Sequence, residues 1–264
     1  MSRTVLVTGA TRGVGRGIAD AFARRRDRLV IVGRSTDASP NKVGLPGTLE
    51  SVAAELEAAG SEVLAIRADL VRTEEAERVV DEVRATWGTP DVVVNNAAAT
   101  FIGPFLDIPV SRWKTAFGLN VLAPVALIHG FLPGMLARDS GRIVNITSAA
   151  ARTREITSSD VPQLSYAASK AALDSFSFGL MQDLASTGIA LDLVAPVVLT
   201  ESVEYHLTDD RFDDLKRRMA PMDAFGEAVA RVADQPPEFR GHYLENHDLE
   251  ALGFLEVGRS RDEA

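Results

Sequence analysis

Short apolar runs alternate along the chain with longer segments in which apolar residues recur at helical spacing. The short runs, rich in β-branched residues, predict strands at residues 4–8, 28–32, 62–67, 91–95, 142–147 and 189–195. The longer segments predict helices at 14–26, 49–59, 73–87, 111–137 and from Tyr166 to about residue 186. We expect Pro124 to bend the fourth helix and Pro133 to loosen its end. Strands this apolar need cover on both faces, which is typical of a parallel sheet in an α/β protein.

The pattern weakens beyond Pro196, where we expect helices near 210–220 and 223–234 and a short strand near 242–244. No repeat and no low-complexity linker divides the chain. The sequence therefore predicts one α/β domain over residues 1–257, with about seven strands in a doubly wound parallel sheet and helices on both faces. The charged segment 258–264 is expected to be a disordered tail.

Composition limits the partners and sites that the chain can have. Its 264 residues carry a net charge of -9, with a pI near 5.0, which argues against nucleic acid or an anionic membrane as a partner. Zero cysteines exclude disulfides, thiolate metal sites and a cysteine nucleophile. The four histidines show no tight spacing with carboxylates, so we expect no metal site.

The location of the protein is predicted from two further features. Residues 1–3 lead straight into an apolar strand and leave no room for a signal peptide. No uninterrupted apolar run approaches the ~20 residues that a membrane span needs. We therefore expect a cytoplasmic protein.

A glycine-rich turn, Gly-Ala-Thr-Arg-Gly-Val-Gly, follows the first predicted strand and opens onto a helix. Glycines let the backbone approach a pyrophosphate closely, and a helix N-terminus supplies N–H donors. The spacing differs from the commoner Gly-x-Gly-x-x-Gly, but its strand–turn–helix context is that of a Rossmann-type dinucleotide site. The alternative is an ordinary βα loop. The predicted contacts in this turn are Gly9, Thr11, Arg12, Gly13, Val14 and Gly15.

The end of the second predicted strand bears on the choice of dinucleotide. It reads Gly33-Arg34-Ser35, with no acid before Asp37. An acid here would suit a free ribose 2′-hydroxyl, whereas an arginine suits a 2′-phosphate. With Arg12 in reach from the turn, Arg34 and Ser35 favour NADP(H) over NAD(H). The alternative is that both arginines are solvated surface groups.

Tyr166 and Lys170 lie four positions apart in an alanine-rich segment, so they share one face of a helix. A free tyrosine has a pKa of about 10. An ammonium at ~4 Å in an effective dielectric of about 20 would favour the phenolate by roughly 4 kcal/mol. That would lower the pKa of Tyr166 by up to about three units, less the effect of burial. Alone, this spacing also occurs by chance on solvated helices.

Together, the Tyr-x-x-x-Lys pair and the glycine turn resemble the short-chain dehydrogenase/reductase family. Further motifs of that family occur in order over roughly residues 3–200. They are Asp69-Leu70 at the adenine ring, Asn95-Asn96-Ala97-Ala98 after the fourth strand, the tetrad residues Asn120 and Ser148, and the nicotinamide segment with Pro196, Val198 and Thr200.

The resemblance implies an NADP(H)-dependent oxidoreductase that interconverts a ketone or aldehyde and an alcohol. Tyr166 would exchange the proton with the substrate oxygen, and Lys170 would lower its pKa and hold the nicotinamide ribose. Ser148 would orient the carbonyl, and Asn120 would carry a water linked to Lys170. Taken singly, Ser148 could instead cap a turn and Asn120 could satisfy a backbone carbonyl. The family also implies a homo-oligomer, a dimer or tetramer, formed through two long helices.

The chain departs from the family pattern at several places. Ala98 replaces the last glycine of Asn-Asn-Ala-Gly, and Val197 replaces a glycine, which puts the loop after Pro196 in doubt. Ser148 and Tyr166 are 18 positions apart, more than the family's usual spacing. The additional residues fall in 152–164, and a second long loop covers 35–47; both are similar to the hydroxysteroid-dehydrogenase-like branch. The segment 239–243 stands where the family has a Thr-Gly turn and Asp-Gly-Gly.

The substrate is expected to be a medium-sized, partly apolar ketone or secondary alcohol. Its pocket is predicted to be lined by residues after Ala98, by the segment 149–164 and by the segment 199–222, among them Phe101, Phe105, Ile156, Leu164, Tyr205 and His206. A different class of function remains open, a non-catalytic dinucleotide-binding sensor or scaffold on the same fold.

Overall fold

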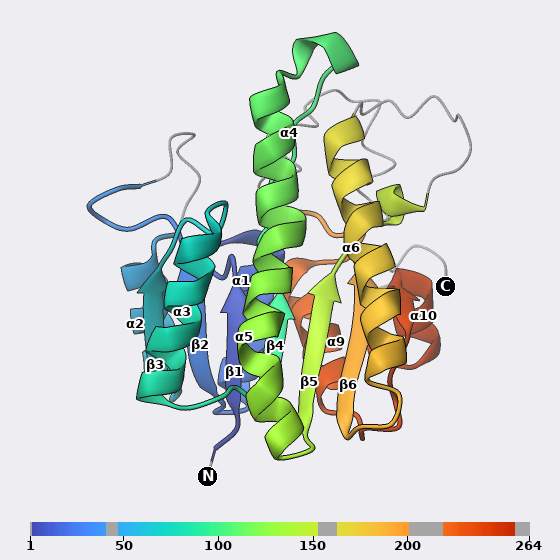
Figure 1. Cartoon of the computed structure of the whole chain (residues 1–264). Helices are drawn as coiled ribbons and strands as arrows, with labels where there is room; N and C mark the ends of the chain where they lie inside the picture. The colour runs from blue at the N-terminus through green and yellow to red at the C-terminus, as the bar shows by residue number, and fades with distance from the viewer. Residues whose placement is uncertain (1, 41–46, 153–162, 201–218, 257–264) are drawn as a thin grey trace, which may run out of the picture.

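The computed structural model describes residues 2–40, 47–152, 163–200 and 219–256 (Figure 1). Its centre is a seven-stranded sheet in the order β3-β2-β1-β4-β5-β6-β7, in which every neighbouring pair is parallel. The strands are β1 Thr4–Thr8, β2 Arg28–Gly33, β3 Val63–Arg67, β4 Val92–Asn95, β5 Gly141–Ile146, β6 Ile189–Ala195 and β7 Tyr243–Glu245. The predicted doubly wound α/β fold is confirmed.

Helices cover both faces of this sheet, because successive residues of each strand point to opposite sides (Figure 1). Val5 and Val7 of β1 pack with Phe22 and Phe225 in one core layer, whereas Leu6 packs in the other. The helices are α1 Gly13–Arg24, α2 Leu49–Ala58, α3 Thr73–Thr86, α4 Val110–Phe117, α5 Ala123–Ala137, α6 Leu164–Asp183, α9 Met222–Ala233 and α10 Asn246–Ala251.

The connections from β1 and β4 run in opposite directions across the sheet, since β2 and β3 lie on one side of β1 and β4 to β7 on the other. The crevice at such a switch point, outside the carboxyl ends of the strands, is where open α/β sheets bind ligands. Apart from Asn120, which lies in the helical run between β4 and β5, the motifs singled out in the sequence follow a strand at this edge or face it from α6.

The predicted helix 111–137 is present as one continuous helical run, Val110–Ala137. A π-helical turn, Gly118–Leu122, joins α4 to α5, and Pro124 lies directly after it, in the first turn of α5. The run Val110–Ala137 is long and apolar enough, by length and composition alone, to cross a membrane. A core helix of a soluble protein passes the same test, and Leu127 and Phe131 are fully buried against the sheet.

Other boundaries shift by one or two residues. Helix α1 ends at Arg24 and the chain turns at Arg26, which has φ of 59°. The sequence did not predict α10, a short helix directly after β7. The expected helix at 210–220 and the expected tail at 258–264 lie outside the described residues, except for 219 and 220.

Candidate active site

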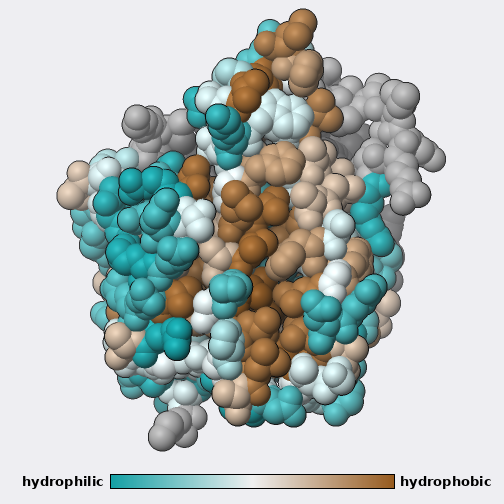
Figure 2. All heavy atoms as spheres, viewed as in Figure 1, coloured by the Kyte–Doolittle hydropathy of each residue, from teal (hydrophilic) through white to brown (hydrophobic). Residues whose placement is uncertain are grey.

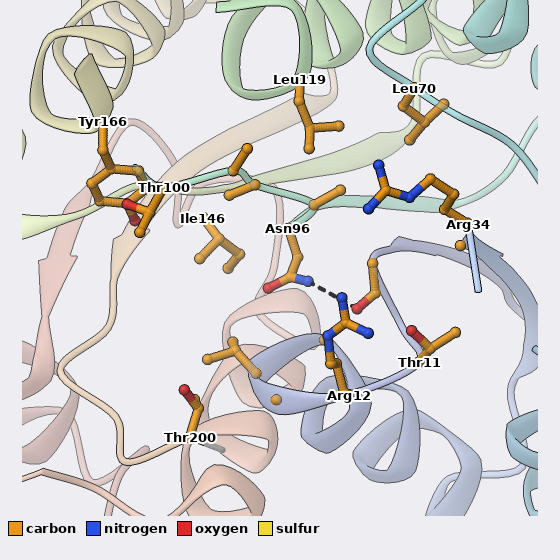
Figure 3. Close-up of a pocket in the computed structure, with 18 of the residues that line it drawn as sticks. Thr11, Arg12, Arg34, Leu70, Asn96, Thr100, Leu119, Ile146, Tyr166 and Thr200 are labelled. Carbon is orange, nitrogen blue, oxygen red and sulfur yellow. Dashed lines mark hydrogen bonds between the residues drawn. The ribbon is translucent and has the colours of Figure 1, made fainter. Parts of the chain in front are cut away.

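A cavity of about 740 Å³ opens at the carboxyl ends of the strands (Figure 3). It is lined by nearly all of the predicted site residues, which lie in the loops after β1 to β6, at the start of α1 and on α6. These are Gly9, Thr11, Arg12, Gly13, Val14, Gly15, Arg34, Ser35, Asp69, Leu70, Asn96, Ala97, Ala98, Ser148, Tyr166, Lys170, Pro196 and Thr200.

The glycine turn is packed so tightly that side chains would not fit. Gly9 and Gly13 have φ of 68° and 55°, in the left-handed region that glycine tolerates. A Cβ at Gly15 would lie 2.3 Å from both Gly9 O and Asn96 Nδ2. Asn96 Nδ2 donates to Thr8 O at 2.8 Å, and Thr8 Oγ1 accepts from the backbone N of Asn96 and Ala97 at 2.9 and 3.0 Å. The turn and the end of β4 therefore form one rigid cradle.

Two arginines lie at the other end of the cavity from Tyr166. In Figure 3 the guanidinium groups of Arg12 and Arg34 extend into the space between the glycine turn and Leu70. Arg34 is exposed at the end of β2, and Ser35 beside it is 5% exposed. This end of the cavity is cationic, with Asp69 the single lining carboxylate among the described residues.

Ser148 and Tyr166 are brought together across the gap of 18 positions, because the end of β5 lies against α6. A hydrogen bond joins the Tyr166 phenol to the Ser148 side chain. Burial raises the pKa of Tyr166 above its ordinary value of 10.0, and the bond to Ser148 offsets part of that rise. Burial also lowers the pKa of Lys170 to about 8, against the opposing effect of Asp174.

The expectation that Lys170 lowers the pKa of Tyr166 is not met in this arrangement. Lys170 Nζ donates to Ile146 O at 2.7 Å and lies 5.8 Å from the centre of the Tyr166 ring. Its ammonium is thus directed to a backbone carbonyl rather than to the phenol oxygen. The estimate from sequence assumed direct contact, and burial of the phenol is the larger effect here.

Asn120 lies in the π-helical turn and is fully buried. Its Oδ1 accepts from Ala99 N at 2.8 Å, and its Nδ2 donates to Ala99 O at 3.0 Å and to Ser169 Oγ at 2.8 Å. Ser169 Oγ donates to Tyr166 O at 2.7 Å. Asn120 therefore ties the loop after β4 to the first turns of α6. It does not line the cavity, and its role in a proton relay stays a prediction.

Val198 is placed differently from the other predicted cofactor contacts. It is 6% exposed, belongs to the core and forms a β-bridge with Ala220, so it does not line the cavity. Val197 does not have a positive φ. Among the described residues, the non-glycine residues with a positive φ are Arg26 and Asp139. Instead, Asn246 of α10 accepts from Val197 N at 3.1 Å and donates to Val197 O at 2.9 Å.

Only part of the predicted set of substrate contacts lines the cavity in the structure. Phe101 lines the cavity, but Phe105 is 62% exposed and packs edge-on against Trp113. Leu164 is 54% exposed and also lies outside the lining. The other three lie outside the described residues: Ile156, Tyr205 and His206.

Arg112 and Leu119 line the cavity but were missed by sequence reasoning. They belong to no motif, and only the fold brings them to the strand ends. Thr100, Ile102 and Gln163 also line it, in the predicted segments after Ala98 and at 149–164, and Thr100 lies beside Tyr166 in Figure 3. Asp174, one helical turn beyond Lys170, could have been found, because a carboxylate at that spacing shares the face of Tyr166 and Lys170.

A metal site is not evident in the part of the chain that the structure describes. No group of three histidine or acidic side chains there is placed to hold an ion.

Comparison with known proteins identifies the family. Residues 3–210 match the short chain dehydrogenase family. The chain belongs to this family. Its relatives include a 3-oxoacyl-[acyl-carrier-protein] reductase FabG of Staphylococcus epidermidis, 30% identical over 86% of this chain and 87% of that protein. The ketoacyl reductase HetN of Nostoc sp. is 34% identical over 76% of this chain, and the match spans 64% of that protein.

Solved short-chain dehydrogenases have the same fold. A metagenomic short-chain oxidoreductase in complex with NADP is 26% identical, with a TM-score of 0.73 over 92% of this chain and 96% of that one. The L-sorbose reductase of Gluconobacter frateurii, complexed with NADPH and L-sorbose, is 25% identical, with a TM-score of 0.79 over 92% and 94%. The chain is therefore a member of an oxidoreductase family, and nothing in these relatives points specifically to the hydroxysteroid branch.

Proposed function

We propose that this protein is an NADP(H)-dependent oxidoreductase that interconverts a ketone or aldehyde and an alcohol, with Tyr166 as the general acid and base. The observation that carries the proposal is the meeting of two motifs in one cavity. The hydrogen-bonded pair of Tyr166 and Ser148, with Lys170 beside it, lines the same space as the rigid glycine cradle.

The cradle fits a dinucleotide, because the glycine turn lines the same elongated space as Asp69, Leu70 and Arg34. The turn from Gly9 to Gly15 and the N-terminus of α1 would hold the pyrophosphate, and Asp69 and Leu70 the adenine. Arg12 and Arg34 suit a 2′-phosphate, and the NADP and NADPH complexes of the structural relatives support this preference. When bound, the nicotinamide supplies or accepts the hydride.

Proton transfer at the substrate oxygen is the task of the protein's own side chains. Because the pKa of Tyr166 is raised, its phenol is protonated at neutral pH and ready to donate to a carbonyl oxygen. Ser148 can donate a second hydrogen bond to that oxygen and orient it. Lys170, with a pKa of about 8, holds a proton close behind the phenol at neutral pH.

The substrate would occupy the end of the cavity around Tyr166. Phe101, Ile102 and Leu119 make that end partly apolar, and Thr100 adds a buried hydroxyl that has no hydrogen-bond partner in the described parts of the chain. A medium-sized carbonyl compound suits this mixture. The relatives' names suggest 3-oxoacyl thioesters and L-sorbose as the first compounds to try.

We also propose a cytoplasmic homo-oligomer, a dimer or tetramer, that associates through the outer face of α5 and α6. Figure 2 shows a continuous apolar surface over these helices. Leu122 is 52% exposed, Leu136 45% and Phe178 38%. Large exposed apolar patches on soluble proteins mark interaction surfaces, and a second copy of the same face would cover this one.

The decisive assay follows NADPH consumption across a panel of 3-oxoacyl thioesters, L-sorbose and α-diketones. We expect turnover with at least one of these, a loss of at least about 1,000-fold in kcat for Tyr166→Phe, and a smaller loss for Ser148→Ala. Equilibrium binding of NADPH by both variants is the control for folding. NADPH binding with no turnover of any carbonyl or alcohol would support the sensor or scaffold instead.

A further inference from the structure

Three successive residues at the end of β5 are each held by a different side chain. Lys170 Nζ donates to Ile146 O at 2.7 Å. The Thr147 hydroxyl donates to the Asp174 carboxylate, which is 6% exposed. Tyr243 OH donates to Ser148 O at 3.2 Å. The first two come from α6, which carries Tyr166, but the third comes from the last strand of the sheet.

Tyr243 is itself held in place on two sides. Its backbone pairs with Leu193 in the parallel ladder between β6 and β7. The Arg152 guanidinium lies 3.8 Å from the centre of its ring, which is cation–π distance. Arg152 directly follows the short 3-10 turn Ala149–Ala151, and Ser148 Oγ accepts from Ala150 N at 3.2 Å at the start of that turn. Tyr243 and Arg152 thus brace the turn that presents Ser148.

The hydroxyl of Tyr243 remains a donor at every assay pH. Burial and the nearby carboxylate of Asp174 raise its pKa well above its ordinary value. The bond to Ser148 O restrains the peptide plane that follows Ser148, and with it the direction of the Ser148 side chain. A displacement of a positioned group by a fraction of an ångström can lower a rate considerably.

We propose that Tyr243 is a positioning residue for Ser148, through which the C-terminal segment β7–α10 contributes to the active site. The segment 239–243 stands where the family pattern differs in sequence, so this contact belongs to the chain's own C-terminal end. The proposal rests on the proposed function, because Ser148 must act on the substrate for its position to matter in turnover.

A double-mutant cycle tests this, with the panel compound that wild-type enzyme reduces fastest as the probe. Tyr243→Phe keeps the ring over Arg152 and removes only the hydroxyl. We expect kcat to fall about 3- to 10-fold, as for loss of one hydrogen bond, with the KM for NADPH unchanged. In a Ser148→Ala background the same substitution should have no further effect. His247→Ala, at a side chain 74% exposed on α10, is the matched control and should leave kcat unchanged.

The result that overturns the proposal is an unchanged kcat in Tyr243→Phe, or an equal loss in both backgrounds. A loss of melting temperature with normal kcat per NADPH-binding site would also overturn it, since it would show a purely structural contact.

A second double-mutant cycle, read out by NMR chemical shifts, tests the proposal without depending on turnover. The chain has three tyrosines, so ¹³Cζ-tyrosine gives three resonances, and Tyr166→Phe identifies that of Tyr166. We expect Tyr243→Phe to shift the Tyr166 resonance when Ser148 is present and not in Ser148→Ala. An unshifted resonance, or an equal shift in both backgrounds, would contradict the positioning role. If no carbonyl is turned over, the proposed function fails while this measurement still decides the contact.

Discussion

At the scale of single residues, burial governs the ionisation of the groups around Tyr166. It raises the pKa of Tyr166, lowers that of Lys170 to about 8 and raises that of Asp174 to about 6. Each shift favours the neutral form, as expected where water is excluded. The site thus holds a protonated phenol beside an amine and a carboxylate that both titrate within about one unit of neutral pH. Such clusters are typical of sites that move protons.

Asp174 provides a pH-dependent test of this burial. Its pKa of about 6 in the folded protein lies above the value of about 3.9 for an unfolded chain. The folded state therefore binds more protons than the unfolded state between these values, and stability falls as pH rises from about 4 to 6. Asp174→Asn removes this slope, so its free energy of unfolding relative to wild type should rise by about 2 kcal/mol between pH 4 and pH 7.

Urea denaturation of both proteins at several pH values measures that difference. Glu227→Gln is a control of opposite sign, because the hydrogen bond from Arg25 lowers the pKa of Glu227 to about 2. Glu227 contributes stability that is present above about pH 4.5 and lost as pH falls through about 2. If the difference in free energy of unfolding between wild type and Asp174→Asn does not change with pH, the pKa of Asp174 is not raised.

Arg34 tests the choice of cofactor. Arg34→Ala should raise the KM for NADPH about 10- to 100-fold and leave that for NADH nearly unchanged, since a charged hydrogen bond to the 2′-phosphate is lost. Steady-state kinetics with both cofactors give the ratio. Lys114→Ala, an exposed lysine of α4 outside the cavity, is the control for a general loss of positive charge. An unchanged ratio in Arg34→Ala would reject the NADP(H) assignment.

At the scale of elements, close backbone contact between α1 and α9 supports the glycine turn that precedes α1. Helices α1 and α9 meet at two buried glycines: a Cβ at Gly226 would lie 2.1 Å from Gly17 O, and a Cβ at Gly17 would lie 2.3 Å from Met222 O. The ion pair of Arg25 and Glu227 flanks this crossing. Because α1 begins at Gly13, its packing against α9 also holds the cradle.

Gly226→Ala separates helix propensity from this packing. Propensity alone predicts a gain of about 0.5–1 kcal/mol for alanine within a helix. The contact with backbone atoms of Gly17 cannot relax without moving α1, so we expect a loss of about 2–4 kcal/mol instead. Thermal and urea unfolding give the sign. A gain in stability would show that the helices do not cross this closely.

At the scale of the whole molecule, the C-terminal segment returns to the active site and the apolar helix face turns away from it. Asn246 of α10 holds Val197, and Tyr243 of β7 holds Ser148, so both ends of the catalytic edge depend on residues beyond 240. The outer surface of α5 and α6 faces away from the sheet (Figure 1, Figure 2). Catalysis and association would thus use separate surfaces of one rigid fold.

Leu122→Glu tests the proposed association. A charge on this face should dissociate the oligomer, since an unpaired carboxylate would be buried at the interface. Mass measurement by light scattering after gel filtration should change from that of an oligomer to one near 28.3 kDa. Leu106→Glu is the control, because Leu106 is 90% exposed on the short 3-10 helix Phe105–Asp107, and its mass should equal that of wild type. An oligomer that survives Leu122→Glu would place the interface elsewhere.

The sequence by itself determined the alternation of strands and helices, the glycine turn and the pairing of Tyr166 with Lys170. These depend on period, on glycine and on spacing within one element, which are local properties. Only the tertiary structure decided what the pair does, because Lys170 turns to Ile146 O and burial raises the pKa of Tyr166. It also decided that Val198 is a core residue and that Asn246 and Tyr243 support Val197 and Ser148. Contacts between residues some 50 to 95 positions apart, such as these, leave no period or spacing in a single sequence.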